Sequence, residues 1–258
     1  MAQGRKFIIG TSGYSFTDWV GTFYPPEATQ REMFSYYVQA FSTVELNFTY
    51  YRMPVPNTLE KLAGRSPAGF TFWVKANQEL THKGNLAIAG EFVEGLSPLR
   101  DAGKLAGVLV QFPQSFHRTP DSRKYLADVV ENLASVPLAV EFRHSSWQTP
   151  ETLASLRQRK VTLVAPDVPD IASLYHSPAA ATTTTGYLRL HSRDASKWYT
   201  GGADRYDYSY SPDELKQIAE EWSALKEPLD EVYVFFNNCH AGQAARNAQE
   251  FHRIVAGL

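Results

Sequence analysis

The sequence has little of what disulfide frameworks, thiolate metal sites and membrane spans require. A single cysteine, Cys239, excludes an internal disulfide and a multi-thiolate zinc site, and it suits a reducing compartment. No apolar run approaches the roughly 18 residues that a membrane-spanning helix needs, and the first residues lack the apolar stretch of an export signal. We therefore expect a cytoplasmic protein with no membrane partner.

A general excess of basic charge is also absent. The formal net charge is −2 at pH 7, which provides no broad field to hold nucleic acid, so nucleic acid is not the favoured partner. The chain instead has 43% hydrophobic residues over 258 positions, enough for one large core. We expect a single domain that spans residues 1–258.

Short β-rich runs recur along the chain, with helical patterns between them. The runs are FIIGTSG (7–13), TVELN (43–47), TFWVKA (71–76), AGVLVQF (106–112), LAVEFRH (138–144), TLVAPD (162–167), GYLRLH (186–191) and EVYVFFNN (231–238). Apolar residues at helical spacing occupy 125–133, 215–225 and 244–251. Hydroxyl side chains followed by proline and acids, at Thr149 and Ser211, mark two helix starts.

This alternation of strand and helix predicts an α/β fold with a parallel sheet. Eight such units in a chain of 258 residues match the size of a closed (β/α)₈ TIM barrel. An open doubly wound sheet is the alternative. No run is followed by the glycine fingerprint of that fold, although GTSGYS after the first run is a weak relative. We therefore expect a closed barrel of eight parallel strands.

Three connections are longer than a compact barrel needs. They are 82–90, 168–185 and 192–211, and long connections are usually functional or disordered. In a barrel, the connection after a strand lies on the catalytic face. The tyrosine- and glycine-rich segment 192–211 is therefore a candidate lid or rim.

Charged residues occur inside runs that otherwise have the character of buried strands. Side chains two apart on a strand share a face, so Glu141 and Arg143 point one way and His144 the other. Charges in a parallel strand are rare unless they are paired or functional. In a barrel, such residues from several strands are expected to converge at the C-terminal mouth: Glu45, Lys75, Glu141, Arg143, Asp167, Arg189 and His191.

The same residues have a structural interpretation. Ion pairs of Glu141 with Arg189, or of Glu45 with Lys75, could fill the barrel and fix its register. Barrel interiors are usually filled by branched apolar side chains, and each desolvated ion costs several kcal/mol unless it is well paired. So many polar residues at one end favour a functional site. Three histidines on connections are expected at the surface: His82, His117 and His176.

Ordered motifs give the chain a resemblance to a known family. GTSGYSFTDWVGTFYP, TVELNFTYYRMP, FWVKANQELTH, GVLVQFPQSF, VEFRHSSW, YLRLHSR and FFNNCHAGQAARNA resemble the YecE-like family, domain of unknown function 72, over nearly the whole chain. The resemblance implies a (β/α)₈ barrel, found in bacteria and archaea, without an established reaction. The chain departs from the pattern at Tyr14, Phe48 and Ser192, where the family commonly has tryptophan, serine and glycine.

We expect an enzyme, of hydrolase, isomerase or lyase class, that acts on an anionic, polyhydroxylated small molecule such as a sugar phosphate, a sugar acid or a nucleotide-like compound. Carboxylates in different electrostatic settings can serve as acid and base, and three nearby cations favour an anionic substrate. The expected catalytic residues are Glu45, Glu141, His191 and Lys75. The expected substrate-binding residues are Ser12, Asn47, Tyr51, Arg52, Gln111, Arg143, Trp147, Arg189 and Asn237.

Two alternatives remain open at this point. No cofactor is predicted, but a divalent metal held by Glu45, Glu141, Asp167 and His191 would make the protein an isomerase or a phosphodiesterase-like or endonuclease-like barrel, although no dense ligand motif supports it. Aromatic residues near the mouth would instead suit a non-catalytic carbohydrate- or nucleic-acid-binding protein. The oligomeric state does not follow from the sequence.

Overall fold

The strands form one ring of parallel elements. The computed structural model describes residues 5–177, 179–200, 202 and 204–258, and within them eight strands make one sheet. Their bounds are β1 (Lys6–Thr11), β2 (Thr43–Leu46), β3 (Thr71–Lys75), β4 (Leu105–Gln111), β5 (Leu138–Glu141), β6 (Thr162–Asp167), β7 (Thr185–Leu190) and β8 (Glu231–Phe236). Each overlaps one of the runs predicted from the sequence. The prediction of a (β/α)₈ TIM barrel is confirmed.

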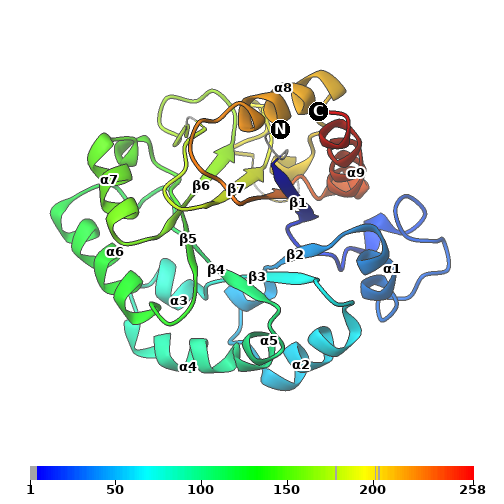
Figure 1. Cartoon of the computed structure of the whole chain (residues 1–258), viewed down its shortest axis with the longest axis horizontal. Coiled ribbons are helices and arrows are strands. Elements are labelled where there is room, and N and C mark those ends of the chain that lie inside the picture. Colours follow the sequence, from blue (N-terminus) through cyan, green and yellow to red (C-terminus); the bar gives the residue numbers. More distant parts are fainter. Residues whose placement is uncertain (1–4, 178, 201, 203) are drawn as a thin grey trace.

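Helices surround this ring on the outside (Figure 1). The α-helices are α1 (Met33–Ala40), α2 (Pro56–Arg65), α3 (Gln78–Thr81), α4 (Ala89–Gly95), α5 (Ser97–Asp101), α6 (Pro120–Asn132), α7 (Pro150–Gln158), α8 (Pro212–Ser223) and α9 (Gln243–Ala256). Short 3₁₀ helices are η1 (Thr17–Trp19), η2 (Phe48–Tyr50), η3 (Leu86–Ile88), η4 (Ser145–Trp147), η5 (Asp204–Tyr206) and η6 (His240–Gly242). No described helix is long and apolar enough to cross a membrane.

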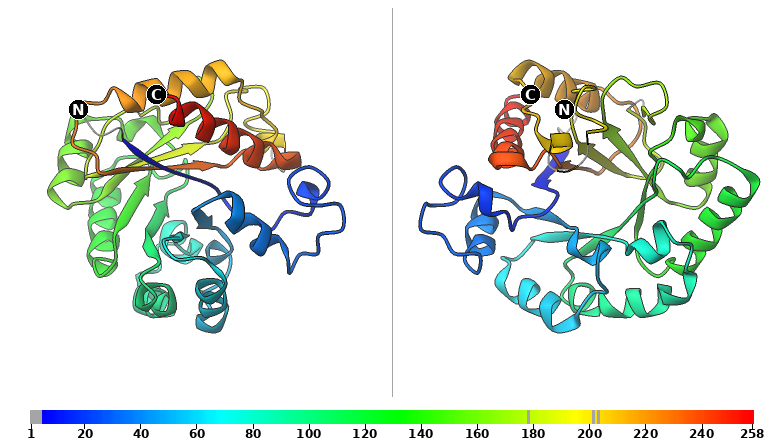
Figure 2. Two further views of the ribbon diagram at one scale, coloured as in Figure 1. Left: turned by 45° about the vertical axis from the view of Figure 1, so that its right-hand side comes forward. Right: turned by 180° about the vertical axis from the view of Figure 1, so that it is seen from behind.

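Side-chain caps begin the helices where the sequence predicted them. The Thr149 hydroxyl accepts a hydrogen bond from the Thr152 amide at the start of α7. Ser211 and Glu214 form a reciprocal capping box at the start of α8, where each side chain accepts from the other residue's amide. Helix α9 packs outside β1 and β8, and α8 lies beside α9, as Figure 2 shows.

The ring has a seam between β1 and β2. The strand order is β1-β8-β7-β6-β5-β4-β3-β2, and a single bridge between Ser12 and Glu45 joins the two ends of this order. The Tyr37 hydroxyl of α1 replaces a ladder bond at the seam, since it accepts from the Thr11 amide at 2.9 Å and donates to the Thr43 carbonyl at 3.0 Å. A side chain therefore completes the closure of the barrel.

The interior of the ring has an apolar layer beneath a polar one. Alternate residues of neighbouring strands fill the lower layer: Ile8, Trp73, Leu109, Ala139, Val164, Tyr187, Tyr233 and Phe235. Two positions beyond five of these residues, the same inward face carries polar side chains: Lys75, Gln111, Glu141, Arg189 and Asn237. This parity directs the polar side chains toward the C-terminal end of the barrel.

Candidate functional site

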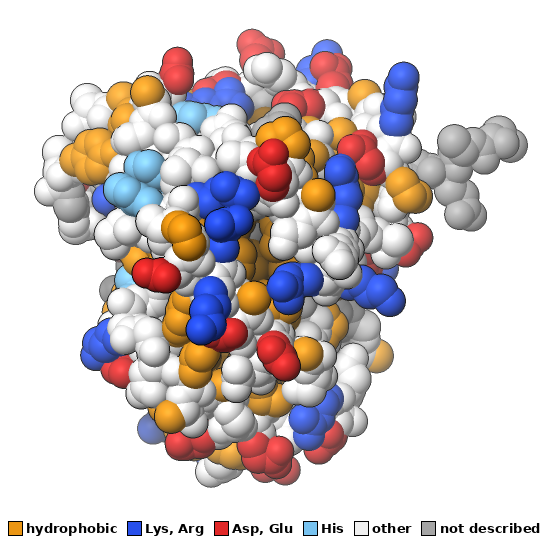
Figure 3. Space-filling model, turned by 90° about the vertical axis from the view of Figure 1, so that its left-hand side faces the viewer, with side chains coloured by type: hydrophobic (Ala, Val, Ile, Leu, Met, Phe, Trp, Pro, Cys, Tyr) orange, Lys and Arg blue, Asp and Glu red, His pale blue; other side chains and the backbone are white. Residues whose placement is uncertain are grey.

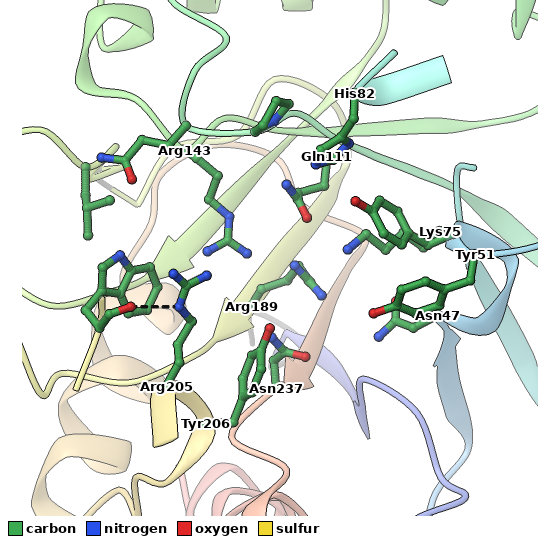
Figure 4. Close-up of a pocket in the computed structure, with 15 residues that line it drawn as sticks. Asn47, Tyr51, Lys75, His82, Gln111, Arg143, Arg189, Arg205, Tyr206 and Asn237 are labelled. Carbon is green, nitrogen blue, oxygen red and sulfur yellow. Dashed lines mark hydrogen bonds between the residues drawn. The ribbon is translucent and has the colours of Figure 1, made fainter. Parts of the chain in front are cut away.

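A cavity of about 350 Å³ opens at the C-terminal ends of the strands. Figure 4 shows side chains from strand ends and from the following connections directed into it. The cavity is lined by Asn47, Tyr50, Tyr51, Lys75, His82, Gln111, Pro113, Gln114, Arg143, Leu174, Arg189, Trp198, Arg205, Tyr206 and Asn237. Lysine and arginine supply the charge, and no aspartate or glutamate is among the described residues of this lining.

A buried arginine lies at the floor of the cavity. Arg189 is 1% exposed, and its Nε and Nη2 donate to the two oxygens of Glu45 at 2.9 and 2.7 Å. Its Nη1 donates to Glu141 Oε2 at 2.5 Å, and the Tyr187 hydroxyl donates to Glu45 Oε2 at 2.7 Å. Burial opposes the charge of Arg189, but the two carboxylates outweigh it and raise the pKa of the guanidinium.

A second arginine extends this network into the cavity. Arg143 Nε lies 2.6 Å from Glu141 Oε1, an ion pair rather than a well-aligned hydrogen bond, and 14% of the Arg143 side chain is exposed. Burial alone would raise the pKa of Glu141, but Arg143 and Arg189 together hold it well below its usual range. Glu141 is therefore a carboxylate that fixes two arginines.

His191 lies beneath these groups as a neutral ring. Asn237 Nδ2 lies 2.8 Å from His191 Nδ1, and His191 Nε2 lies 3.5 Å from both Glu141 Oε1 and Arg143 Nη2. Burial and the charge of Arg143 lower the pKa of His191 to about 3. At neutral pH His191 is therefore an uncharged ring and not an imidazolium acid.

Lys75 is the last residue of β3, and its side chain enters the cavity without an acidic partner. Its Nζ lies 4.6 Å from the centroid of the Tyr50 ring, and in the described part of the chain no hydrogen bond or ion pair engages it. Burial first, and then Arg189, lower the pKa of Lys75 to about 7 against the opposing effect of Glu45 and Glu141. An amine of this kind exchanges its proton near neutral pH.

The surface position expected for His82 is confirmed, but the residue also lines the cavity, a role that was not predicted. His82 follows α3 and lines the cavity, where its ring meets Tyr50 edge to face with centroids 5.1 Å apart. Burial and the neighbouring Lys75 lower its pKa to about 4. Its position on a connection hid this role, since the sequence contains no signal for how α3 folds back over the barrel mouth.

Described residues of the connection 192–211, which was predicted as a candidate lid or rim, form one wall of the cavity. Trp198, Arg205 and Tyr206 from this segment line the cavity. Arg205 Nε donates to the Trp198 carbonyl at 2.8 Å, and its guanidinium lies 4.9 Å from the Trp198 ring centroid. A Lys197–Asp207 ion pair of 2.8 Å ties the segment together. Arg205 and Tyr206 were missed as individual site residues.

The predicted convergence of charges fails for Asp167. Val164 points into the barrel, so Asp167, three residues further along β6, points outward. There its carboxylate accepts from Arg193 Nη2 and from the Tyr210 hydroxyl, each at 2.7 Å. Within residues 5–177, 179–200, 202 and 204–258, no group of three or more His, Cys, Asp or Glu could hold a metal ion. The residues expected as metal ligands therefore do not fit one.

The remaining predicted binding residues divide into two groups. Those that line the cavity are Asn47, Tyr51, Gln111, Arg143, Arg189 and Asn237. Ser12 lies beneath, with its hydroxyl 3.5 Å from Arg189 Nη2, and Arg52 packs over the Phe48 ring. Trp147 stacks on Phe142, with centroids 4.3 Å apart, outside the barrel. These three do not contact the cavity.

The positive character belongs to the cavity and not to the molecular surface as a whole. On the face drawn in Figure 3, basic and acidic side chains are interspersed. This distribution agrees with the formal net charge of −2.

Comparison with known proteins identifies relatives along nearly the whole chain. The family described as "Protein of unknown function DUF72" matches residues 8–257. The chain is 29% identical to the "UPF0759 protein YunF" of Bacillus subtilis over 267 residues, which cover 96% of this chain and 94% of that protein. A DUF72 family crystal structure from Thermotoga maritima is 36% identical, with a TM-score of 0.90, and covers 97% of this chain and 99% of its own. A second, from Enterococcus faecalis, is 24% identical with a TM-score of 0.85, covering 97% and 95%.

Proposed function

The chain belongs to the DUF72 family of proteins of unknown function. We propose that it is an enzyme that binds an anionic, polyhydroxylated small molecule at the barrel mouth. The observation that carries the proposal is the cavity lining, which has Lys75, Arg143, Arg189 and Arg205 and, in its described part, no carboxylate. A phosphate, a carboxylate or both would balance this charge.

The balance of charges supports an anion in particular. Glu45 and Glu141 match the charges of Arg189 and Arg143 in the floor. Arg205 contacts a carbonyl and an indole ring, so its charge stays uncompensated on the side of the cavity opposite Lys75. Amides and phenols supply neutral hydrogen-bonding groups for hydroxyls: Asn47, Gln111, Gln114, Asn237, Tyr51 and Tyr206.

The proposed chemistry is proton transfer, but the residues assigned to it differ from those expected from the sequence. Glu45 and Glu141 are 0% exposed and lie behind the arginines. We therefore assign them the task of holding Arg189 and Arg143 in place, instead of contact with the ligand. Lys75 reaches the cavity and has a pKa of about 7, close to the value that favours proton transfer at neutral pH. It replaces the carboxylates as the proposed acid/base group.

A non-catalytic carbohydrate-binding role is the second candidate. Tyr51 lines the cavity and is 75% exposed, and Tyr199, 57% exposed, donates a hydrogen bond to the cavity residue Gln114. Exposed phenol rings at a cavity edge suit stacking against a sugar ring. Both candidates take the same ligand class, and they differ only in whether the ligand is changed.

The test is a comparison of matched ligands by thermal unfolding. Sugar phosphates, sugar acids and glycerol 3-phosphate are expected to raise Tm, whereas uncharged sugars and glycerol at equal concentration leave it unchanged. Arg143→Ala should abolish the shift, and Arg246→Ala, a change outside the lining, should not. If the charged and the uncharged compounds raised Tm equally, the proposal of an anionic ligand would be refuted. NMR of each stabilising ligand with the protein then distinguishes turnover from binding alone.

A further inference from the structure

We infer that Lys75 is a nucleophilic amine that forms an imine with an aldehyde or ketone carbonyl of an anionic ligand. The inference rests on the proposed function and deepens it, because it adds a carbonyl group to the description of the ligand. Its basis is the position of one nitrogen: Lys75 Nζ lies in a cationic cavity, on the inward face of β3, and no carboxylate of the described residues is bound to it.

The geometry leaves the nitrogen available for reaction. In Figure 4, Lys75 points toward the middle of the cavity from the side opposite Arg143. The neighbour recorded for its Nζ is the face of the Tyr50 ring, which does not occupy the nitrogen lone pair of a neutral amine. A lysine with a purely structural role would instead donate its protons to acceptors.

Lys104 provides that contrast within the same molecule. Its Nζ donates to the Ala63 carbonyl, the Ser66 carbonyl and the Ser66 hydroxyl, each at 2.7 Å. Three acceptors fully use the three protons of an ammonium group. Burial lowers the pKa of Lys104 as well, but its nitrogen is held as a donor outside the cavity lining. Lys75 has both a lowered pKa and a nitrogen that is free to react, whereas Lys104 has only the lowered pKa.

The electrostatic setting keeps part of Lys75 unprotonated. The pKa of about 7 means that neutral amine and ammonium are comparably populated at neutral pH. An ordinary lysine has only about one neutral amine in 10³ at this pH. The neutral form is the nucleophile, so the site provides it without an additional base.

The chemistry balances within the site. The Lys75 nitrogen attacks the carbonyl carbon, a C–N bond forms, and the carbonyl oxygen becomes the hydroxyl of a carbinolamine. The C–O bond then breaks, and the oxygen leaves as water with the two protons that the amine nitrogen carried. The product is a neutral imine, no oxidant or reductant is consumed, and protonation of the imine makes it an electron sink for bonds next to the former carbonyl carbon.

Other cavity groups position the ligand for this step. Arg143 and Arg205 approach from the side opposite Lys75 in Figure 4, so they would bind the anionic group while the carbonyl faces the amine. The Asn47 side chain lines the cavity near β2, and its buried Oδ1 accepts no hydrogen bond from any described residue. This unused amide is available to the ligand's hydroxyls.

Reductive trapping tests the inference. The whole protein is incubated at about pH 7 with glyceraldehyde 3-phosphate, or with glyoxylate, in the presence of sodium cyanoborohydride, which reduces an imine to a stable amine. Intact mass and peptide mapping then locate the adduct. We expect at least about tenfold more adduct at Lys75 than at exposed lysines such as Lys83, because their neutral fractions differ so widely.

Matched variants and ligands separate the outcomes. Lys75→Arg keeps the charge and should lose the selective adduct, whereas Lys83→Arg should keep it. Glycerol 3-phosphate and glycolate lack the carbonyl, so they should protect Lys75 from trapping and raise Tm without forming an adduct.

Two results would contradict the inference in distinguishable ways. Stabilisation by the alcohols with labelling spread evenly over the lysines would overturn the imine and leave the proposed anionic ligand intact. Failure of every anion to stabilise the protein, together with unselective labelling, would overturn both. An adduct that forms selectively at Lys75, and that glycerol 3-phosphate or glycolate prevents, supports both the anionic ligand and the imine.

Discussion

At the scale of single residues, the decisive group is a guanidinium that water does not reach. Arg189 is surrounded by Glu45, Glu141 and the Tyr187 hydroxyl, so its charge is balanced within the protein. Removing one member of a buried ion network leaves the others charged and unpaired, which destabilises far more than the intact network stabilises. The floor of the cavity is therefore intolerant of single substitutions.

Arg189→Met is expected to lower the free energy of unfolding by about 3–5 kcal/mol, because two buried carboxylates lose their partner. Urea denaturation measures the change. The control is Arg193→Met, which removes a partly exposed partner of Asp167 and should cost about 1 kcal/mol. If the two variants lost equal stability, the buried network would not be the stabilising unit described here.

Lys75 adds a pH dependence whose sign follows from its environment. The charged and titratable groups that face it are Arg189 of β7, Glu45 of β2, Glu141 of β5, Arg143 and His82. Its folded pKa of about 7 is below the roughly 10.4 of an unfolded lysine. Between these values the unfolded chain binds more protons, so stability rises with pH; below pH 7 the penalty of the buried charge is fully present.

Lys75→Met is accordingly expected to gain stability relative to the unmodified protein at about pH 6 and to lose that advantage by about pH 9.5. The variant carries no lysine at this position, so the pH-dependent contribution is absent from it. Urea denaturation of both proteins at the two pH values gives the comparison. A difference independent of pH would contradict the lowered pKa.

At the scale of elements, the seam between β1 and β2 is the place where the ring depends on a side chain. The Tyr37 hydroxyl pairs with the Thr11 amide and the Thr43 carbonyl. A β-carbon added at Gly10 would lie 2.3 Å from the same Thr43 carbonyl oxygen, so the two strands approach too closely for any larger residue there. Close approach and a tyrosine bridge together hold the seam.

Tyr37→Phe is expected to lower the free energy of unfolding by about 1–3 kcal/mol, since a buried amide and a buried carbonyl lose their partner. Hydrogen exchange at the Thr11 amide should accelerate in parallel. Tyr36→Phe is the neighbouring control, because the described residues offer its hydroxyl no hydrogen bond, and it should change stability little. Similar losses in both variants would mean that the phenol at the seam is not a bridge.

The strands show how far a sequence alone can predict this site. Parity along the run 138–144 placed Glu141 and Arg143 on one face correctly, because alternation is a local property of strands. The same argument failed for Asp167, whose position was judged by its place at a strand end without reference to the inward Val164. Counting along the strand from the inward Val164 gives the outward orientation of Asp167 directly.

Residues on connections were beyond such reasoning. His82, Arg205 and Tyr206 reach the cavity because segments fold over the barrel mouth, and their contacts join positions far apart in the sequence. Arg205 depends on Trp198 for its orientation, a contact that no periodic pattern predicts. The burial of Glu45 and Glu141 behind arginines also needed the three-dimensional arrangement, since sequence showed only that the charges share a face.

At the scale of the whole molecule, a protein of net charge −2 contains a positive cavity. We expect the Kd for glycerol 3-phosphate to increase several-fold between about 50 and 500 mM sodium chloride, because salt screens the attraction between the cationic cavity and the anionic ligand. Calorimetry at several salt concentrations measures this dependence. Binding that did not respond to salt would indicate recognition of the hydroxyls alone.

The cavity is assembled from two sources that the chain keeps separate. Its floor comes from strand ends tied by the Arg189 network, and one wall comes from the connection 192–211 with Trp198 and Arg205. The two parts can therefore diverge independently during evolution: replacement of the connection would change which ligands enter while the reactive floor is inherited unchanged. A chimera carrying a relative's connection should acquire that relative's ligand preference and retain its own trapping at Lys75.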